Sequence, residues 1–533
     1  MRRHSAFLVL LVAAGTLEFA FASQGRIASF GDDSVSYLVL ANYFAGSSGD
    51  AFAAQWAPYH SHFPPLLPAL LWLSGGVHDY RVAYAVVAGL SVLALPLVYR
   101  FASRELGGEA PGLAVVLAFV LMPTAWITLK GIMSESLYLF LAMASLAFFQ
   151  ARVEGREASP GDRLAFGLLL GLACLSRALG VALVLAYGAH CAVRLATGRE
   201  KPRAGLLVPL APVGAMLAAW YVLRPTAGSD AYLRAAAQVL AAWREDPAPM
   251  LVTSLANLAS GWIASFSSQA HVSSIVDALA LAVGAAALAG TALRLRRNRL
   301  DAWFVLASVA IVVPWVFSVE NTRRLIYPLL PLLLLAAGDL VRWGIDRAAA
   351  SRWSRAQVAA IAFAVPVVAS LPALVLVARK ASDADTVIPG YAYTYREVAE
   401  YYTTVDVKAA RDRAKLAVVT LGGLESLEGA TPPGSRVMWM RPEYVGVLGH
   451  REGIPFLYRW TPVELAREVK RTGTDYILQT WLFKTDLEVA QGNPRPTVSA
   501  YTHRAFGIGD IFLLLRVDRA ALDAYLQQAG GAR

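Results

Sequence analysis

The sequence predicts a polytopic α-helical membrane protein with about eleven transmembrane helices and a C-terminal α/β domain outside the membrane. Of the 533 residues, 57% are hydrophobic and 16% are charged, whereas soluble domains contain roughly 45–50% apolar and about 25% charged residues. The mean hydropathy is +0.49. Apolar runs of about 17–20 residues recur, and a helix of this length crosses a hydrocarbon core ~30 Å thick. Because lipid offers the backbone no hydrogen-bond partners, these runs must be helical.

Each apolar run is interpreted as one span. The predicted spans are residues 5–23, 82–99, 111–128, 134–151, 163–176, 178–193, 205–222, 275–293, 302–318, 324–341 and 356–378. The stretch 163–193 has about thirty residues, which is long for one span and short for two. A single span would place the basic segments on either side of it on opposite faces of the membrane. We therefore predict a short hairpin that turns near Ser176 and Arg177.

The arginine and lysine residues of the loops assign the two faces of the membrane. One set of connections, which includes the N-terminus and residues 294–299, is rich in arginine, and the alternate set is longer and poorer in basic residues. The positive-inside rule makes the basic set cytoplasmic. Residues 1–378 then form a membrane domain with a cytoplasmic N-terminus, and residues 379–533 form an extracytoplasmic domain. The net charge of +10 is explained by these loops, which argues against nucleic-acid binding.

Other sequence features bear on the compartment. The first span, with its basic start and the small-residue motif Ala20-Phe21-Ala22, also fits a cleavable signal peptide, whose removal would leave the remaining topology unchanged. Cys174 and Cys191 both lie inside apolar runs, which excludes a disulfide framework or a zinc ribbon. The chain contains no Asn-x-Ser/Thr sequon, and its composition is rich in alanine and arginine. These features favour the bacterial inner (plasma) membrane.

Long extracytoplasmic segments offer room for a site. They are the first outer loop (residues 24–80), a second loop (residues 223–274) and the C-terminal domain. In this domain strand-like runs alternate with helical patterns, which predicts an α/β fold. The runs are Lys415–Leu421, Arg436–Met440, Asp475–Gln479 and Ile511–Val517. A helix is predicted to start after Thr461, where Pro462 and Glu464 complete a capping box.

Two adjacent carboxylates, Asp32 and Asp33, follow the first span and precede a helical pattern that begins at Ser34. At the start of this helix they would cap it and complement its dipole. As a functional pair at the membrane surface they would repel each other, which raises the pKa of one carboxyl towards a value suited to a general base. One residue can serve both roles, so both interpretations stay open.

The same loop continues with His60 and His62 in a proline-containing stretch. We expect these histidines to hydrogen-bond a substrate or to serve the structure of the loop. A divalent metal ion held by both histidines and an aspartate is a further alternative. No cofactor is firmly predicted.

Further charged residues are predicted at the outer membrane surface. Glu135 opens the fourth span shortly after Lys130, and Arg177 lies at the tip of the short hairpin. Helix-end charge complementarity and interfacial anchoring would explain them without a function. Arg323 and Arg324 lie on the outer side, against the positive-inside bias. Because guanidinium groups bind phosphate through charge-assisted hydrogen bonds, this pair predicts a lipid headgroup or a phosphate-linked substrate.

Short motifs follow one another at the predicted outer surface. They are Asp32-Asp33, Pro64-Pro65, Ser134-Glu135 and Arg324-Leu325-Ile326-Tyr327-Pro328-Leu329-Leu330-Pro331. In this order they resemble the C-type glycosyltransferase (GT-C) superfamily, and above all its protein-mannosyltransferase-like and aminoarabinose-transferase-like branch. The segments Pro432–Val437 and Gly473–Ile477 are also similar to C-terminal domains of bacterial members.

The resemblance implies a GT-C-like fold and an inverting transferase that moves a hexose or pentose from a polyprenyl-phosphate donor to an extracytoplasmic acceptor. The family usually has Asp-Glu at the acidic pair, and by position the resemblance implies Asp32 as the base and Asp33 as a supporting residue. The residues expected to bind substrate are His60, His62, Lys130, Glu135, Arg177, Arg323, Arg324 and Tyr327. The acceptor stays open between an envelope glycan, a lipid and a protein.

Other classes of protein remain as alternatives. A secondary transporter would carry its charges near mid-membrane and often contain inverted repeats, whereas the charges here lie at the outer rim. Another enzyme that depends on a lipid phosphate, such as a polysaccharide ligase, would use the same charges. A non-catalytic assembly factor would tolerate the loss of Asp32, which an enzyme would not.

Overall fold

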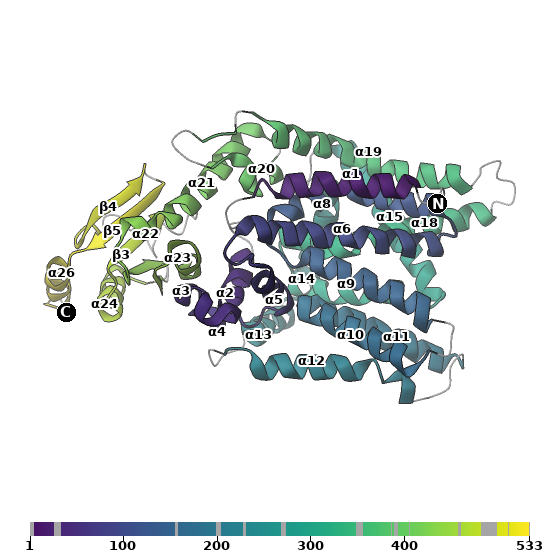
Figure 1. Ribbon diagram of the computed structural model, residues 1–533, viewed down its shortest axis with the longest axis horizontal. Coiled ribbons are helices and arrows are strands. Elements are labelled where there is room, and N and C mark those ends of the chain that lie inside the picture. Colours follow the sequence, from purple (N-terminus) through teal and green to yellow (C-terminus); the bar gives the residue numbers. More distant parts are fainter. Residues whose placement is uncertain are drawn as a thin grey trace.

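The computed structural model describes residues 5–25, 33–154, 158–198, 204–226, 231–267, 273–347, 355–384, 386–388, 393–404, 406–456, 460–480, 498–509 and 511–531. Its long helices lie side by side along the long axis, and a smaller domain with a β-sheet covers one end of this bundle (Figure 1). We call this the domain end, and the N-terminus lies at the opposite end. The predicted fold class, a polytopic helical protein with a C-terminal α/β domain, is confirmed.

The helices of the bundle and its loops follow in chain order. They are α1 (Ser5–Ala22), α2 (Ser34–Ala45), α3 (Ala51–Ala54), α4 (Ala57–His60), α5 (Leu66–Ser74), α6 (Tyr80–Glu105), α7 (Glu109–Val120), α8 (Pro123–Ile127), α9 (Glu135–Phe148), α10 (Pro160–Ser176), α11 (Val181–Ala196), α12 (Leu210–Leu223), α13 (Ala231–Glu245), α14 (Pro247–Ser267), α15 (Ser274–Arg296), α16 (Leu300–Val312), α17 (Val319–Ile326), α18 (Leu330–Arg347) and α19 (Arg355–Ser382). Short 3₁₀ turns at Ala178–Gly180, Val313–Trp315 and Tyr327–Leu329 join some of them.

The lengths of the helices test the predicted spans. In the described part of the chain, 7 helices are long and apolar enough to cross a membrane, or 8 if Glu109–Val120 and Pro123–Lys130, which meet at 60°, form one span. Every predicted span overlaps a helix, but α10, α12 and α16 have only 17, 14 and 13 residues, so the count of about eleven is not confirmed. The predicted break at Ser176 and Arg177 is confirmed, because α10 ends at Ser176 and Arg177 has an extended backbone.

The first outer loop folds into the short helices α2 to α5 at the domain end (Figure 1). Asp50 caps α3, since its carboxylate accepts hydrogen bonds from the amides of Phe52 at 2.7 Å and Ala53 at 3.2 Å. The Asp50 amide in turn donates to Asn42 Oδ1 on α2 at 2.9 Å. A Cβ at Gly49 would lie 2.4 Å from the Asn42 carbonyl oxygen, so the turn between the two helices requires glycine.

The C-terminal domain contains one mixed sheet with the strand order β2-β1-β3-β5-β4. Its strands are β1 (Arg436–Trp439), β2 (Glu452–Pro455), β3 (Tyr476–Thr480), β4 (Thr502–Ile508) and β5 (Phe512–Val517). β1 pairs in parallel with β2 and β3, whereas β5 pairs antiparallel with β3 and β4. The helices of this domain are α20 (Glu400–Thr403), α21 (Val407–Glu425), α22 (Leu427–Ala430), α23 (Pro442–Gly449), α24 (Pro462–Thr472) and α26 (Arg519–Gly531).

Most predicted elements of this domain are confirmed. The strand-like runs that form strands are Arg436–Met440, Asp475–Gln479 and Ile511–Val517, which correspond to β1, β3 and β5. The capping box of Thr461 and Glu464 begins α24 as predicted. The prediction of a strand at Lys415–Leu421 is wrong, because this run lies inside α21. An apolar run does not by itself separate a strand from a buried helix, and here the side chain of Asp406 caps a helix that continues through the run.

A buried ionic network holds the helices together at the end opposite the domain. The Arg294 side chain is 2% exposed and pairs with Glu105 at 2.7 Å, Asp301 at 2.8 Å and Asp339 at 3.3 Å. These carboxylates come from α6, α16 and α18, whereas Arg294 is on α15. One guanidinium therefore joins four helices. Glu105 and Asp339 also pair with Arg299 and Arg297. Removal of Arg294 would therefore leave the buried Asp301 carboxylate without its cation and would weaken the compensation of the other two.

We expect Arg294→Ala to lower the free energy of unfolding by about 3–5 kcal/mol, the usual cost of breaking a buried ion pair. The measurement is the loss of helical circular dichroism with rising SDS in mixed micelles. Arg297→Ala is the matched control, because Arg297 also pairs with Asp339 but its side chain is 45% exposed, and we expect a change below about 1 kcal/mol. Equal effects of the two substitutions would contradict this account of the network.

Candidate functional site

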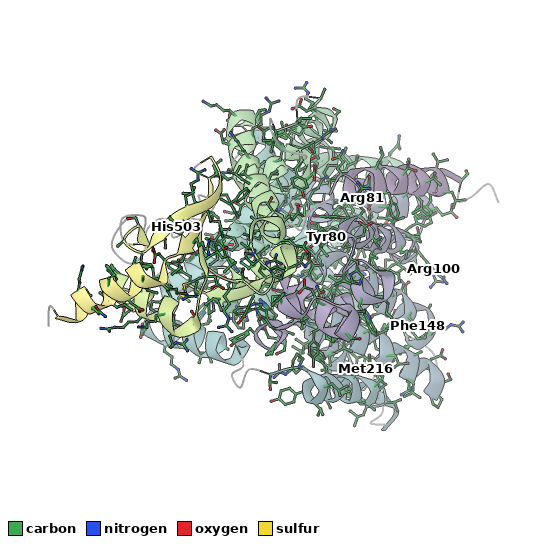
Figure 2. The ribbon with its side chains drawn as sticks, turned by 60° about the vertical axis from the view of Figure 1, so that its left-hand side comes forward. Tyr80, Arg81, Arg100, Phe148, Met216 and His503 are labelled. Carbon is green, nitrogen blue, oxygen red and sulfur yellow. The ribbon has the colours of Figure 1, made fainter. Side chains whose placement is uncertain are left out.

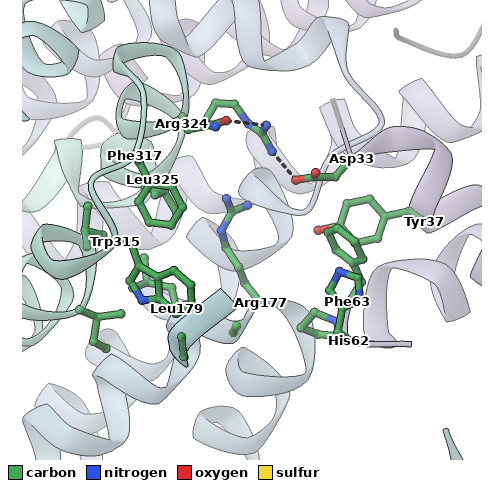
Figure 3. Close-up of a pocket in the computed structure, with 16 residues that line it drawn as sticks. Asp33, Tyr37, His62, Phe63, Arg177, Leu179, Trp315, Phe317, Arg324 and Leu325 are labelled. Carbon is green, nitrogen blue, oxygen red and sulfur yellow. Dashed lines mark hydrogen bonds and ion pairs between the residues drawn. The ribbon is translucent and has the colours of Figure 1, made fainter. Parts of the chain in front are cut away.

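Four charged side chains meet at the domain end of the bundle, and we call them the charge cluster: Asp33, Glu135, Arg177 and Arg324. Arg324 Nη2 donates to Asp33 Oδ2 at 2.8 Å, and its Nε donates to Glu135 Oε1 at 2.9 Å. Arg177 Nη1 lies 3.0 Å from Glu135 Oε2. Acidic and basic groups therefore alternate from Asp33 to Arg177. Figure 3 shows Arg324 and Arg177 pointing towards the start of α2, where Asp33 lies.

Local structure explains how these residues reach one point. Asp33 directly precedes α2 and Glu135 is the first residue of α9, so both carboxylates lie at positive helix ends. Arg177 is in the extended break between α10 and α11. The Ser34 hydroxyl accepts a hydrogen bond from the amide of Ile132 at 3.1 Å, which ties the start of α2 to the turn before α9. The two acidic residues are thereby held at the same level of the bundle.

Two neutral residues, Tyr37 and Ser134, adjoin the charge cluster, and neither is among the residues that the sequence predicts to bind substrate. The Tyr37 hydroxyl and Ser134 Oγ are 2.7 Å apart, and Arg177 Nη1 donates to Ser134 Oγ at 3.2 Å. Burial raises the pKa of Tyr37, so its phenol stays protonated and can donate. The available signals were positional: Tyr37 is one helical turn beyond Asp33, and Ser134 precedes Glu135.

A cavity of about 560 Å³ opens beside the charge cluster (Figure 3). Asp33, Arg177 and Arg324 supply its charged side. The remaining walls are mainly apolar and come from the first outer loop, the turn Ala178–Gly180, α13, α16 with the turn that follows it, and α17. They include Phe63, Leu179, Ile311, Val312, Trp315 and Leu325. Glu135 lies behind the two arginines and is 1% exposed. The arrangement suits a ligand with an anionic group and a neighbouring apolar part.

The two predicted histidines have different surroundings in the structure. His62 lines the cavity and His60 does not. Burial lowers the pKa of His60 to about 4, so this imidazole is neutral at physiological pH. The ring centroids of the two histidines are 6.4 Å apart. Among the residues that the structure describes, no three His, Cys, Asp or Glu side chains are grouped so that they could hold a metal ion.

Lys130 lies away from the cavity, between the end of α1 and the C-terminal domain. Its Nζ donates to the Phe21 carbonyl oxygen at 2.7 Å and to Gln24 Oε1 at 3.0 Å. The same ammonium lies 4.0 Å from the centre of the Phe21 ring and 5.2 Å from that of Tyr402. The structure thus surrounds Lys130 with groups of this chain and does not bring it to the charge cluster.

Arg323 and Tyr327 are also apart from the cavity lining. Arg323 is buried and pairs with Glu320 on its own helix. Tyr327 is buried against Phe119, with ring centroids 5.6 Å apart. Asp32 lies outside the described residues. Of the two adjacent arginines, the structure therefore directs only Arg324 to the cavity.

The arrangement of helices and domain defines the protein as one with the fold of the GT-C glycosyltransferases. Among solved structures, ArnT from Cupriavidus metallidurans bound to undecaprenyl phosphate is similar, with 13% sequence identity, a TM-score of 0.54 and a match that covers 97% of this chain and 99% of that chain. The archaeal oligosaccharyltransferase AglB from Archaeoglobus fulgidus, in complex with an inhibitory peptide and a dolichol-phosphate, has 12% identity and a TM-score of 0.50, with 96% and 74% covered. No family model matches the chain, and no curated protein sequence does.

Proposed function

We propose that the protein is an inverting glycosyltransferase that moves a sugar from a polyprenyl-phosphate donor to an acceptor on the extracytoplasmic face of a membrane. The observation that carries the proposal is the cavity in which Arg177 and Arg324 adjoin Asp33 between apolar walls. A polyprenyl-phosphate sugar has matching parts, since guanidinium groups bind phosphate and the isoprenoid chain stays in the bilayer. The lipid phosphates named with ArnT and AglB, which share the fold, support this class of donor.

The arginines would stabilise the leaving phosphate. As the bond between the anomeric carbon and the phosphate oxygen breaks, negative charge grows on that oxygen. Arg324 is held by Asp33 and Glu135, and Arg177 is held by Glu135, so both cations are fixed before the reaction starts. Their side chains are 16% and 12% exposed, and partial burial strengthens their attraction for the phosphate.

The acceptor hydroxyl would attack the anomeric carbon from the face opposite the phosphate, so that one C–O bond forms as the other breaks. Its proton passes to a carboxylate within hydrogen-bond reach. Because Asp33 is paired with Arg324, we assign the base to the neighbouring Asp32 and a supporting role to Asp33. His62 and Tyr37, which line the cavity, are assigned to hydrogen-bond the substrates.

The setting of the reaction is part of the same proposal. The basic residues Arg294, Arg297 and Arg299 lie at the end opposite the domain, and the positive-inside rule makes that end cytoplasmic. The domain end would then face the outside of a bacterial inner membrane. The acceptor would be an envelope glycan, lipid or protein.

The direct test uses the purified full-length protein in liposomes with radiolabelled polyprenyl-phosphate sugars. We expect release of the sugar to an envelope extract or to water, and inversion of the anomeric configuration by NMR. Nucleotide sugars and protein-free liposomes are the controls, and neither should support turnover. Solute flux into vesicles without sugar transfer would favour a transporter, and failure to bind any polyprenyl-phosphate donor would overturn the proposal.

A further inference from the structure

Helix α23 of the C-terminal domain packs against α2 and α3 of the first outer loop (Figure 1). All residues of α23 are buried. A Cβ at Gly446 would lie 2.5 Å from the carbonyl oxygen of Phe52 and 3.0 Å from the Cα of Ala53. Since the obstructing atoms are backbone, a side chain at this position would have to displace α3 itself by about 1 Å to restore an ordinary contact. Only glycine permits the observed approach.

A second contact ties the same surfaces together. His450, which directly follows α23, pairs through Nδ1 with the Asp50 carboxylate. Its backbone is left-handed, with a φ of 47°. Asp50 also caps α3 and donates from its amide to Asn42 on α2. His450 therefore contacts Asp50, the residue that joins α2 to α3.

The segments of the first outer loop on both sides of these contacts reach the cavity. α2 begins directly after Asp33 and carries Tyr37, and both residues line the cavity. Beyond α3 the loop continues to His62, which also lines it. A shift of α3 or of the end of α2 would be carried along a rigid helix to Asp33 and Tyr37. Misplacement of reacting groups by about 1 Å can lower a rate about 10²-fold.

We propose that α23 positions the first outer loop for sugar transfer, with Gly446 and His450 as positioning residues. The proposal rests on the proposed function of the cavity. Neither residue lines the cavity, and both contact the loop that supplies part of its wall, so they would act on the reaction through the loop.

The ion pair makes this positioning depend on pH. The hydrogen bond that His450 Nδ1 donates to the Asp50 carboxylate raises the pKa of His450 above its ordinary 6.5. Burial works to raise the pKa of Asp50, but hydrogen bonds from His450 and the amides of Ala53 and Phe52 outweigh it and hold the pKa below 3.8. The pair is therefore fully formed from pH 3.8 to pH 6.5 and is lost as the pH rises through the raised pKa of His450.

Other charged groups face this pair. Glu428 also favours the protonated imidazole of His450, whereas Arg451 opposes it. Glu425 on α21 is attracted to the charged His450. None of these three residues belongs to the first outer loop, so removal of His450 should abolish the pH dependence of the contact with the loop.

The test compares full-length variants in liposomes by hydrogen exchange of residues 34–54 and by steady-state kinetics. We expect Gly446→Val to speed exchange in α2 and α3 and to lower kcat about 10- to 100-fold, with a KM for the donor changed less than about threefold. Gly429→Val is the matched control, since a Cβ at Gly429 meets nothing within 4 Å, and it should match the wild type. In the wild type we expect the protection of residues 34–54, corrected for the intrinsic exchange rate, and kcat both to fall as the pH rises above 6.5. His450→Asn, which tolerates the left-handed backbone, should remove both changes. Lys470→Asn, at an exposed ion pair with Asp523, should keep them.

Unchanged exchange of residues 34–54 in both Gly446→Val and His450→Asn would overturn the positioning role. Faster exchange with an unchanged kcat would overturn it as well, because the contact would then only stabilise the fold. If the wild type turns over no polyprenyl-phosphate donor, the proposed function fails separately, and the exchange measurements still decide whether α23 orders the loop. If Gly446→Val does not fold, the pH dependence of exchange in His450→Asn decides it.

Discussion

Replacement of Arg324 by alanine is expected to lower kcat for sugar transfer about 10²- to 10³-fold, the usual loss when one preorganised donor to developing negative charge is removed. Arg324 is the residue of the charge cluster that contacts both acids and also lines the cavity. Its removal would deprive the departing phosphate of this guanidinium. Glu135, which is 1% exposed, would then keep Arg177 as its remaining partner in the cluster. Single-turnover release of labelled sugar measures the chemical step directly.

Arg324→Lys separates charge from geometry. Lysine keeps a positive charge but cannot place two fixed donors on Asp33 and Glu135, so we expect an intermediate loss of about 10- to 100-fold. Arg81→Ala is the control, because Arg81 is exposed at the start of α6 in the same outer region, and it should retain full activity. Thermal unfolding of each variant in detergent checks that the fold is intact. A fully active Arg324→Ala protein would remove the charge cluster from the proposed mechanism.

The acidic pair should give the second large effect. We expect Asp32→Asn to lower kcat about 10²- to 10⁴-fold, which is the range for loss of a general base. Asp33→Asn should lower it by a smaller factor of about 10, because Asp33 is paired with Arg324 and acts on the phosphate site through it. Measuring kcat for sugar transfer at several pH values separates the two variants, since only loss of the base should abolish the acid limb of the pH–rate profile.

Asp79→Asn provides the matched control for these variants. Asp79 is an exposed carboxylate of the same outer loop that caps α6 by accepting from the Arg81 amide at 2.8 Å. Asparagine caps a helix about as well, so activity should not change. If Asp33→Asn proves more damaging than Asp32→Asn, the base is Asp33 and its pairing with Arg324 must break on substrate binding.

Several features of the protein follow from local sequence. Each predicted span overlaps a helix, because a long apolar run in lipid has no other way to pair its backbone groups. The capping box at Thr461 formed as predicted, because its hydrogen bonds join residues three positions apart. Where the local signal was ambiguous the prediction failed: the run Lys415–Leu421 fits a strand or a buried helix, and its packing in α21 decided for the helix.

The tertiary structure decided which residues form the candidate site. Lys130, Arg323 and Arg324 all read as cations of the outer rim, yet only Arg324 reaches the cavity, where it meets Asp33 from a distance of 291 residues along the chain. The physical reason is that spans are apolar on every face, so the sequence does not show which side of a helix turns inward. Chain composition and hydropathy thus determined which segments are helices and which charged residues lie at helix ends. Helix packing, and the docking of the C-terminal domain on the first outer loop, determined which charges meet.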